Sequence, residues 1–272
     1  MTATDQIRVA AVIFNARFGQ IEPNLERMGR FTAEAARQGA SLVCFPEMSI
    51  TGYGTSASVS THALALSSPL LHDLQRIADK NDITVLAGMA EKDGLSNRIF
   101  VSHLAFFPDR PMGVYRRLHI SPPEKSVFSQ GESIPLFDCQ GFTFGIQLCY
   151  DAHFPFLSTR MAEKGADILF MPHASPRGVP EEKFTSWMRH IPARAYDNGV
   201  FVVVCNQTGE NGAGLSFPGL AFAVDPSGRL MAKDISGREG LFVVDLSRQD
   251  LDYVRQHRMR YFLPNRRKDL GD

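Results

Sequence analysis

Two fully apolar runs of strand length constrain the fold of this chain more than any other feature. Residues 8–14 (RVAAVIF) and 199–205 (GVFVVVC) place almost no polar side chain on either face of an extended segment. Strands that are covered on both faces have this composition, as they do in sheets inside layered α/β proteins. Amphipathic segments of helical length separate these runs from other short strands. The sequence therefore predicts an α/β fold with mixed strand connections.

The expected elements begin as alternating strands and helices, and more closely spaced strands follow in each half of the chain. Predicted strands cover residues 7–14, 41–45, 84–91, 98–107, 113–117, 143–148, 168–172, 200–206, 219–224, 229–233 and 240–245. Predicted helices cover residues 21–38, 70–81, 156–164 and 180–198. No low-complexity linker or repeat interrupts this pattern, and α/β folds of this length commonly form one unit. We therefore expect residues 1–272 to form a single domain.

The charge balance argues against partners that bind through a strong electric field. Lys+Arg and Asp+Glu are equal at 29 each, so no net charge attracts nucleic acid or an anionic membrane. No apolar stretch approaches the roughly 20 residues that span a bilayer. The first residues, MTATDQIRVA, lack the layout of a signal peptide. We expect a cytoplasmic protein whose partner is a small molecule, with no nucleic acid and no membrane involved.

The cysteines show neither paired spacing nor a Cys/His spacing that suits zinc. They are Cys44, Cys139, Cys149 and Cys205. Cys44 and Cys205 lie in apolar, β-branched runs, where a free cysteine usually serves as a small buried hydrophobic residue. The sequence predicts neither a metal site nor a cofactor.

Reactive side chains follow three of the predicted strands. Glu47 comes directly after Phe45-Pro46, where proline ends the strand. Cys149 follows the apolar run that ends at Leu148, and a helix is expected soon after it. The segment between them, VYRRLHISPPEKSVFSQG, carries Arg117 and Glu124. A glutamate and a thiol that meet in one cleft indicate covalent acyl transfer, with the glutamate as the base for the thiol.

The strings FPEMSITGY, VYRRLHISPPEKSVFSQG and FGIQLCYDAHFP, in this order, resemble the nitrilase superfamily of carbon–nitrogen hydrolases. The catalytic residues of that family are Glu, Lys and Cys. The resemblance implies a four-layer α-β-β-α sandwich with mixed sheets. It also implies that Cys149 is the nucleophile, that Glu47 is the general base, and that Glu124 is a second glutamate that orients the substrate. The alternative for Glu124 is an exposed pair with Lys125.

The resemblance fails at one important position. The family reads Tyr-x-Lys-x-His where this chain reads Tyr115-Arg116-Arg117-Leu118-His119, so Arg117 occupies the place of the catalytic lysine. Arginine keeps the positive charge that stabilises the oxyanion. A guanidinium also readily forms bidentate hydrogen bonds with carboxylates. Arg117 therefore either replaces the lysine or binds Glu47 or Glu124 and impairs catalysis. Lys125 is the only lysine near it in the sequence.

Further candidates for contact with the substrate lie in the predicted strand-end loops. They are Tyr53, His153, Phe154, His173 and Ser175. Packing or structural roles are the alternatives for Tyr53 and His173, and His153 could instead act as a base for Cys149. Residues 209–219 are rich in glycine but lack the spacing of a phosphate loop, so they are expected to form a flexible loop at the pocket edge.

The resemblance implies a cysteine-dependent hydrolase that cleaves a non-peptide amide or N-carbamoyl bond and releases ammonia through a thioester acyl-enzyme. Its expected partner is a small-molecule amide or carbamoyl substrate. Family members commonly form homodimers or larger homo-oligomers, and residues 258–272 resemble the segment that packs across such an interface. The alternative is a degenerate member of the fold, which binds a small molecule or a partner without efficient catalysis.

Overall fold

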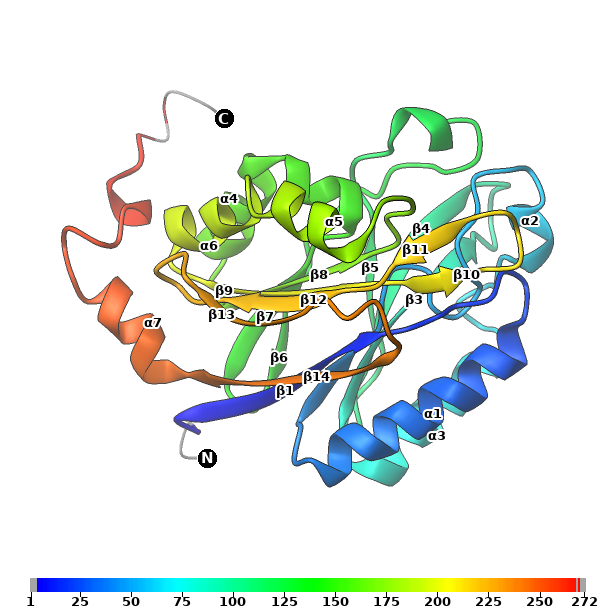
Figure 1. The fold of residues 1–272 in the computed structure, drawn as a ribbon, viewed down its shortest axis with the longest axis horizontal. Helices are drawn as coiled ribbons and strands as arrows, with labels where there is room; N and C mark the ends of the chain where they lie inside the picture. Colours follow the sequence, from blue (N-terminus) through cyan, green and yellow to red (C-terminus); the bar gives the residue numbers. More distant parts are fainter. Residues whose placement is uncertain (1–3, 268, 270–272) are drawn as a thin grey trace.

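Two six-stranded sheets form the centre of the structure (Figure 1), a computed structural model that describes residues 4–267 and 269. The first sheet has the strand order β14-β1-β2-β3-β4-β5. Its strands are β1 Gln6–Ile13, β2 Leu42–Cys44, β3 Thr84–Lys92, β4 Ile99–Phe106, β5 Gly113–Arg116 and β14 Gly240–Ser247. The neighbours β1, β2 and β3 run parallel, and the other pairs are antiparallel.

The second sheet has a similar plan, with the order β13-β12-β9-β8-β7-β6. Its strands are β6 Phe137–Cys139, β7 Phe142–Ile146, β8 Ile168–His173, β9 Phe201–Asn206, β12 Ala221–Val224 and β13 Leu230–Asp234. The neighbours β7, β8 and β9 are parallel and the outer pairs are antiparallel. A small separate sheet pairs β10 Thr208–Glu210 with β11 Ser216–Pro218.

Helices cover the outer faces of both sheets (Figure 1). The helices α1 Ile21–Arg37 and α3 Pro69–Asn81 lie on the first sheet, and α4 Pro155–Glu163, α5 Pro180–Trp187 and α6 Ile191–Asn198 lie on the second. The shorter helices are α2 Val59–His62, α7 Arg248–Arg255 and the 3₁₀ helices η1 Pro122–Glu124, η2 Cys149–His153 and η3 Leu263–Asn265. The predicted four-layer α-β-β-α arrangement with mixed sheets is confirmed.

Strand β1 shows why the apolar runs contain almost no polar residues. Val9, Ala11 and Ile13 lie in the core between the two sheets, together with apolar residues of β7, β8 and β9. Ala10 and Val12 point the other way, into the core beneath α1 and α3. Because successive side chains of a strand alternate between faces, a strand with a core on each side must be apolar throughout.

The helix predicted over residues 180–198 is wrong as a single element. Helix α5 ends at Trp187 and α6 begins at Ile191, with Pro192 in its first turn. Proline has no N–H to donate to the preceding turn of a helix. In an unbroken helix its ring would also clash with the carbonyl of Met188, four residues earlier. The chain therefore breaks before the proline and starts a second helix.

The glycine-rich segment 209–219 is also better ordered than expected. It contains most of the β10–β11 hairpin, whose turn is organised by Asn211. The Asn211 side chain accepts hydrogen bonds from the backbone N–H groups of Ala213 (2.9 Å) and Leu215 (3.2 Å), and donates to the carbonyl of Tyr53 (2.8 Å). The hairpin is thereby tied to the loop that carries Tyr53.

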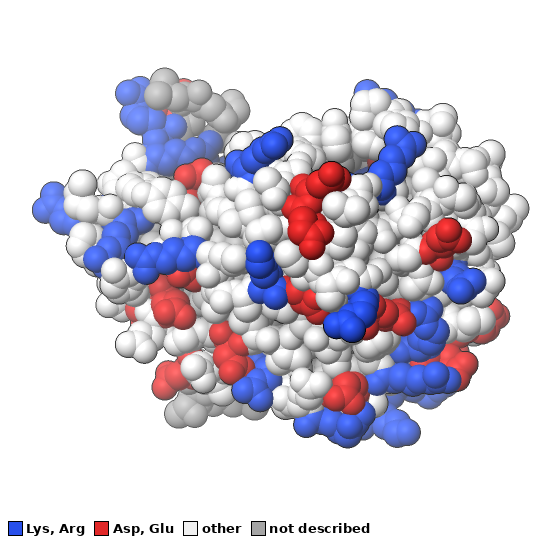
Figure 2. Space-filling view, viewed as in Figure 1, with Lys and Arg blue, Asp and Glu red and all other residues white. Residues whose placement is uncertain are grey.

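Charged side chains are interspersed on the surface. On the face shown in Figure 2, Lys and Arg alternate with Asp and Glu and form no broad area of one sign. Within the described residues, no helix combines the length and the apolar character that crossing a bilayer requires.

Candidate active site

The backbone turn that carries Glu47 is pressed against the neighbouring strand β3. The residue after it, Met48, adopts a positive φ of 55°. A Cβ atom on Gly88 of β3 would lie 2.4 Å from the Met48 nitrogen, so only glycine lets the turn approach this closely. The Glu47 side chain is 0% exposed, and its Oε2 accepts from the Ala174 N–H at 3.1 Å. Gln207, after β9, donates to the Glu47 carbonyl at 2.7 Å, so both sheets hold this glutamate.

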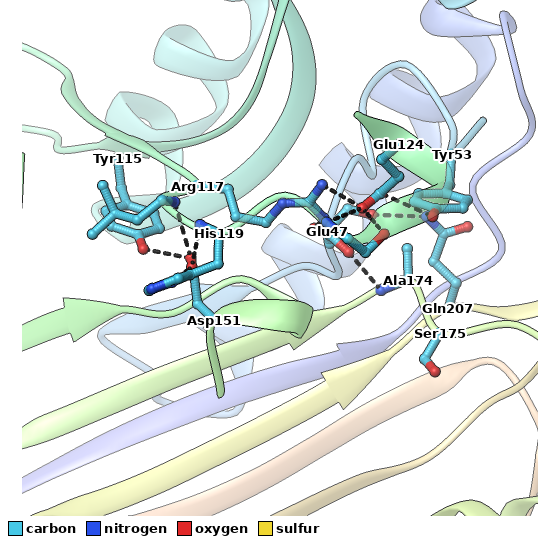
Figure 3. Close-up of polar contacts among 12 residues, drawn as sticks. Glu47, Tyr53, Tyr115, Arg117, His119, Glu124, Asp151, Ala174, Ser175 and Gln207 are labelled. Atoms are coloured by element: carbon cyan, nitrogen blue, oxygen red, sulfur yellow. Dashed lines mark hydrogen bonds and ion pairs between the residues drawn. The ribbon is translucent and has the colours of Figure 1, made fainter. Parts of the chain in front are cut away.

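Arg117 lies between two carboxylates (Figure 3). Its Nη1 donates to Glu47 Oε1 at 2.8 Å and its Nη2 to Glu124 Oε2 at 2.7 Å. The side chain is 1% exposed, and its Nε has no hydrogen-bond partner among the described residues. The guanidinium therefore binds both glutamates, one through each terminal nitrogen, where the sequence suggested one or the other.

Glu124 is buried and not part of an exposed pair with Lys125, which is exposed. It ends the short helix η1, where Ser121 N–H and Oγ also donate to its Oε2. Its other oxygen accepts from Tyr53 Oη at 2.9 Å. Every oxygen of this carboxylate therefore has a donor, which is what makes a buried charge tolerable.

Cys149 follows β7 in a left-handed backbone conformation, with a φ of 37°. A non-glycine residue there costs on the order of 1–3 kcal/mol, and such residues are concentrated at functional sites. The thiol residue is partly exposed, in contrast to Glu47, Arg117 and Glu124. The short 3₁₀ helix η2, which was not predicted, starts at Cys149 itself, and the helix expected soon after the thiol follows as α4. Arg194 supports η2 by donating to the Ala152 carbonyl at 3.1 Å.

A second cluster joins the cysteine turn to the segment that carries Arg117 (Figure 3). The carboxylate of Asp151, two residues after the thiol, is 0% exposed. It accepts from Tyr115 Oη at 2.5 Å and from the His119 N–H at 2.9 Å, and His119 Nδ1 lies 2.7 Å away. Tyr115 and His119 flank Arg117 in the chain, so Asp151 holds Cys149 and Arg117 in fixed relative positions.

Replacing Asp151 with Asn is expected to lower the free energy of unfolding by about 1–3 kcal/mol. The amide offers one acceptor and two donors where the carboxylate accepts from several groups, so buried donors lose partners. Thermal or urea unfolding measures the effect. The matched control is Asp138→Asn, because Asp138 is exposed and, among the described residues, its side chain accepts only from Thr143 Oγ1. An equal loss in both variants would contradict this prediction.

The electrostatics of the site favour transfer of a proton between its groups. Burial raises the pKa of Glu47 to about 7, although the Arg117 charge opposes the shift. Burial, followed by the charge of Glu47, raises the pKa of the Cys149 thiol well above its ordinary value. Burial lowers the pKa of Arg117, but the two glutamates outweigh it and the net shift is upward. The arrangement suits a glutamate that accepts a proton from a neutral thiol as the thiol attacks.

The five residues predicted to contact substrate have different surroundings. Tyr53 joins the centre through Glu124. Phe154 stacks on His119 with ring centroids 3.7 Å apart, and the exposed His153 stacks on His190 at 4.7 Å. Ser175 is partly exposed and follows Ala174, whose N–H binds Glu47.

His173 has the surroundings of a structural histidine, which is the alternative to contact with the substrate. It is 2% exposed, its Nδ1 lies 2.7 Å from the Met171 carbonyl, and its ring packs on Trp187 at 4.1 Å. Burial lowers its pKa to about 3, so the ring is neutral. For the rival base His153, no hydrogen bond to Cys149 is found in the described part of the chain.

Sequence reasoning missed Lys183, on α5. Its Nζ donates to Ser175 Oγ and to the Pro176 carbonyl, each at 3.0 Å, and the Cys149 thiol is near enough to affect its pKa. The expectation that Lys125 was the only lysine nearby considered sequence distance alone. Gln207 and Asp151 were also missed as contacts of the site. Among residues 4–267 and 269, no three His, Cys, Asp or Glu side chains gather in a way that could hold a metal ion.

The chain is similar to known proteins in sequence and in fold. A (R)-stereoselective amidase from Pseudomonas sp. is 29% identical over 261 residues, which make up 93% of this chain and 92% of the relative. A nitrilase from Pyrococcus abyssi is 28% identical over 93% of both chains. An amidase structure from Nesterenkonia sp. shares the fold with a TM-score of 0.82 and 24% identity, covering 99% of this chain and 96% of that one. The model of the carbon–nitrogen hydrolase family matches residues 8–256, and the chain therefore belongs to this family, within the nitrilase superfamily.

Proposed function

We propose that this protein hydrolyses the amide or N-carbamoyl bond of a small molecule, releases ammonia and forms a thioester with Cys149. The observation that carries the proposal is the contact of Arg117 with both Glu47 and Glu124, close to Cys149, a partly exposed residue with a strained backbone. Membership in the family and the amidases among its relatives support the reaction class. In a variant of the amidase from Nesterenkonia sp. AN1, which is 25% identical, acrylamide has added to the active-site cysteine.

The first chemical step forms the carbon–sulfur bond. Cys149 Sγ attacks the carbonyl carbon while Glu47 takes the thiol proton, and the carbonyl π pair moves onto oxygen. A high thiol pKa beside a carboxylate with a pKa of about 7 favours this coupled transfer over a preformed thiolate. Glu47 then returns the proton to the departing nitrogen and the carbon–nitrogen bond breaks. A primary amide releases ammonia at this step, whereas an N-carbamoyl compound releases its amine and yields ammonia and carbon dioxide once the carbamoyl group is hydrolysed. Water hydrolyses the thioester in the same way, again with Glu47 as the base.

Arg117 supplies the positive charge for the tetrahedral oxyanion in this scheme. Each terminal nitrogen carries two hydrogens, and its contact with a glutamate uses one of them. The remaining N–H groups can donate to the oxyanion. Because the site is buried, the positive charge of Arg117 stabilises the oxyanion more strongly than it would in water. Glu124 and Tyr53 hold the guanidinium in place, so Glu124 acts by orienting Arg117.

An assay of ammonia release tests the proposal. The panel contains ω-amides, N-carbamoyl amines, N-carbamoyl amino acids and nitriles, and the Cys149→Ala variant serves as the blank. We expect release above the blank for at least one amide or carbamoyl compound, with acyl transfer to Cys149 visible by mass spectrometry. Equal release by both proteins across the panel would favour the degenerate alternative, which binds without efficient catalysis.

We also infer that the protein assembles as a homodimer or a larger homo-oligomer through residues 258–272. In the described part of this tail, Met259 is 70% exposed and Phe262 is 41% exposed. Tyr196 and Tyr253 nearby expose about half of their side chains, and the Tyr196 and Phe262 rings lie 5.5 Å apart. Apolar residues gathered in this way are typical of protein interfaces. Lys268 and residues 270–272 lie outside the described residues. Sedimentation of the natural chain and of a Met259→Asp/Phe262→Asp variant tests the inference.

A further inference from the structure

Lys183 is a cation for which the mechanism above has no use, although it binds Ser175 next to Ala174 and lies close enough to Cys149 for the two groups to influence each other. It is partly buried on α5, which packs against the end of β8 through the contact between Trp187 and His173. An ammonium group has three donors, and here two are directed at neutral acceptors, Ser175 Oγ and the Pro176 carbonyl, each at 3.0 Å. Among the described residues, the third donor has no acceptor and the charge forms no ion pair.

No carboxylate lies within 4.0 Å of Lys183 Nζ in the part of the chain that the structure describes. Burial lowers the pKa of this lysine, and the nearby Cys149 thiol acts in the opposite direction. A charge that has lost part of its water shell without gaining an anion is poorly solvated. Binding an anion at this point would restore the lost stabilisation.

Glu181 and Glu182 precede Lys183 on α5 but are exposed, and neither forms an ion pair with it among the described residues. The other titratable groups close to the cysteine turn on this side are Arg194, His153 and His190. Arg194, which supports the cysteine turn, donates to the backbone carbonyls of Ala152 and His153 and forms no ion pair with a described carboxylate. His153 and His190 stack on each other, and burial lowers the pKa of both. Among the described residues, the buried carboxylates near the chemistry are Asp151, which accepts from Tyr115 and His119, and the two glutamates that Arg117 binds.

The charges of Glu47 and Glu124 disfavour the binding of an anionic substrate. When both are ionised, they carry two negative charges against the single positive charge of Arg117, so they repel a substrate that bears a carboxylate. A site that accepts such a substrate needs a separate cation close to the thiol and away from the glutamates. Lys183 contacts Ser175, one residue after the Ala174 N–H that binds Glu47, and it has no contact with either glutamate.

We propose that the substrate carries a carboxylate a few bonds from the carbonyl that is cleaved, and that Lys183 binds this carboxylate together with Ser175. The inference rests on the proposed function and deepens it by naming the substrate class. The enzyme is then selective for acidic amides or acidic N-carbamoyl compounds over neutral ones of the same length. Lys183 sets this specificity and takes no part in proton transfer.

Pairs of substrates that differ only in the carboxylate test the proposal. The acidic members are the monoamides of malonic, succinic and glutaric acids and N-carbamoyl-β-alanine. The neutral partners are propionamide, butyramide, pentanamide and N-propylurea. We expect the natural protein to prefer the acidic member of at least one pair in kcat/KM. Lys183→Met should reduce kcat/KM for that acid by about 10- to 100-fold, mainly through KM, because a hydrogen bond to a charged group is lost. Lys183→Arg should retain most of the preference.

The exposed Lys80 on α3, on the other side of the molecule, provides the control. Lys80→Met should leave the ratio of acidic to neutral kcat/KM unchanged. The proposal is overturned if the natural protein shows no preference, or if Lys183→Met leaves the ratio as it is.

A second measurement separates this proposal from the proposed function. If no compound is hydrolysed, the proposed function fails, and calorimetric binding of succinate and glutarate to the natural protein decides the inference. Binding that weakens at least tenfold in Lys183→Met supports a carboxylate site in a non-catalytic protein. Absence of binding, or equal binding by both proteins, overturns it.

Discussion

The Glu47→Gln variant is expected to lose about 10²- to 10⁴-fold in kcat, the usual contribution of a positioned general base. The amide cannot accept the thiol proton, and the thiol, whose pKa burial raises, does not ionise on its own. The natural protein should also show kcat/KM that falls as the pH drops through about 7. In the natural protein, burial raises the pKa of Glu47 to about 7, and only the ionised form of Glu47 acts as a base. Profiles between pH 5 and 9 with the best substrate of the panel measure both effects.

Glu91→Gln provides the matched control for this change. Glu91 is a buried carboxylate of β3 that binds Arg116 and accepts from Ser102 Oγ at 2.5 Å. It has no contact with Glu47, Arg117 or Glu124 among the described residues, so its variant should retain the rate and the change near pH 7. A Glu47→Gln enzyme that keeps more than a tenth of the natural rate, or the same pH profile, would contradict the role of Glu47 as the base.

The parts of the fold that could be predicted depend on local information. Apolar runs marked β1 and β9 because both faces of these strands are buried. Glu47 and Cys149 could be placed at strand ends because proline and a change of polarity stand next to them in the sequence. In sheets of this kind the carboxyl ends of parallel strands share one edge, which explains why the predicted residues meet.

The remaining features depend on contacts between distant segments. Gln207 binds Glu47 across 160 positions and Asp151 binds Tyr115 across 36, and no local pattern records either pair. Lys183 reads as an ordinary polar residue of an amphipathic helix, and only the packing of α5 on β8 brings it near the thiol. The binding of Arg117 to both glutamates likewise depends on how three separate segments are arranged. The residue type alone allows several partners.

Replacing Arg117 with Met is expected to lower the free energy of unfolding by about 3–5 kcal/mol near pH 8, because it leaves two buried carboxylates without their cation. For a chain of this size the melting temperature should fall on the order of 10 °C. The loss should be smaller at pH 5.5. Arg117 is the main influence that lowers the pKa of Glu47, so without it this pKa rises above about 7, further from the ordinary value of 4.5. A group whose folded pKa is raised gives stability below its unfolded pKa and loses it as the pH rises through the folded pKa. Melting curves of the natural and variant chains at both pH values test this.

Two variants separate the charge of Arg117 from its shape. Arg116→Met removes the neighbouring guanidinium, which is one third exposed and binds Glu91, so its loss of stability should be the smaller of the two. Arg117→Lys keeps the charge next to both glutamates, and its stability should remain close to that of the natural chain. The guanidinium favours the ionised form of Glu47 and keeps this carboxylate directed at Arg117. An ammonium is smaller and can move toward the oxygen on which negative charge develops. We therefore expect Arg117→Lys to turn over substrate roughly tenfold faster. An unchanged or lower rate would mean that arginine serves the oxyanion as well as lysine does, and that its contact with both glutamates is part of the working site.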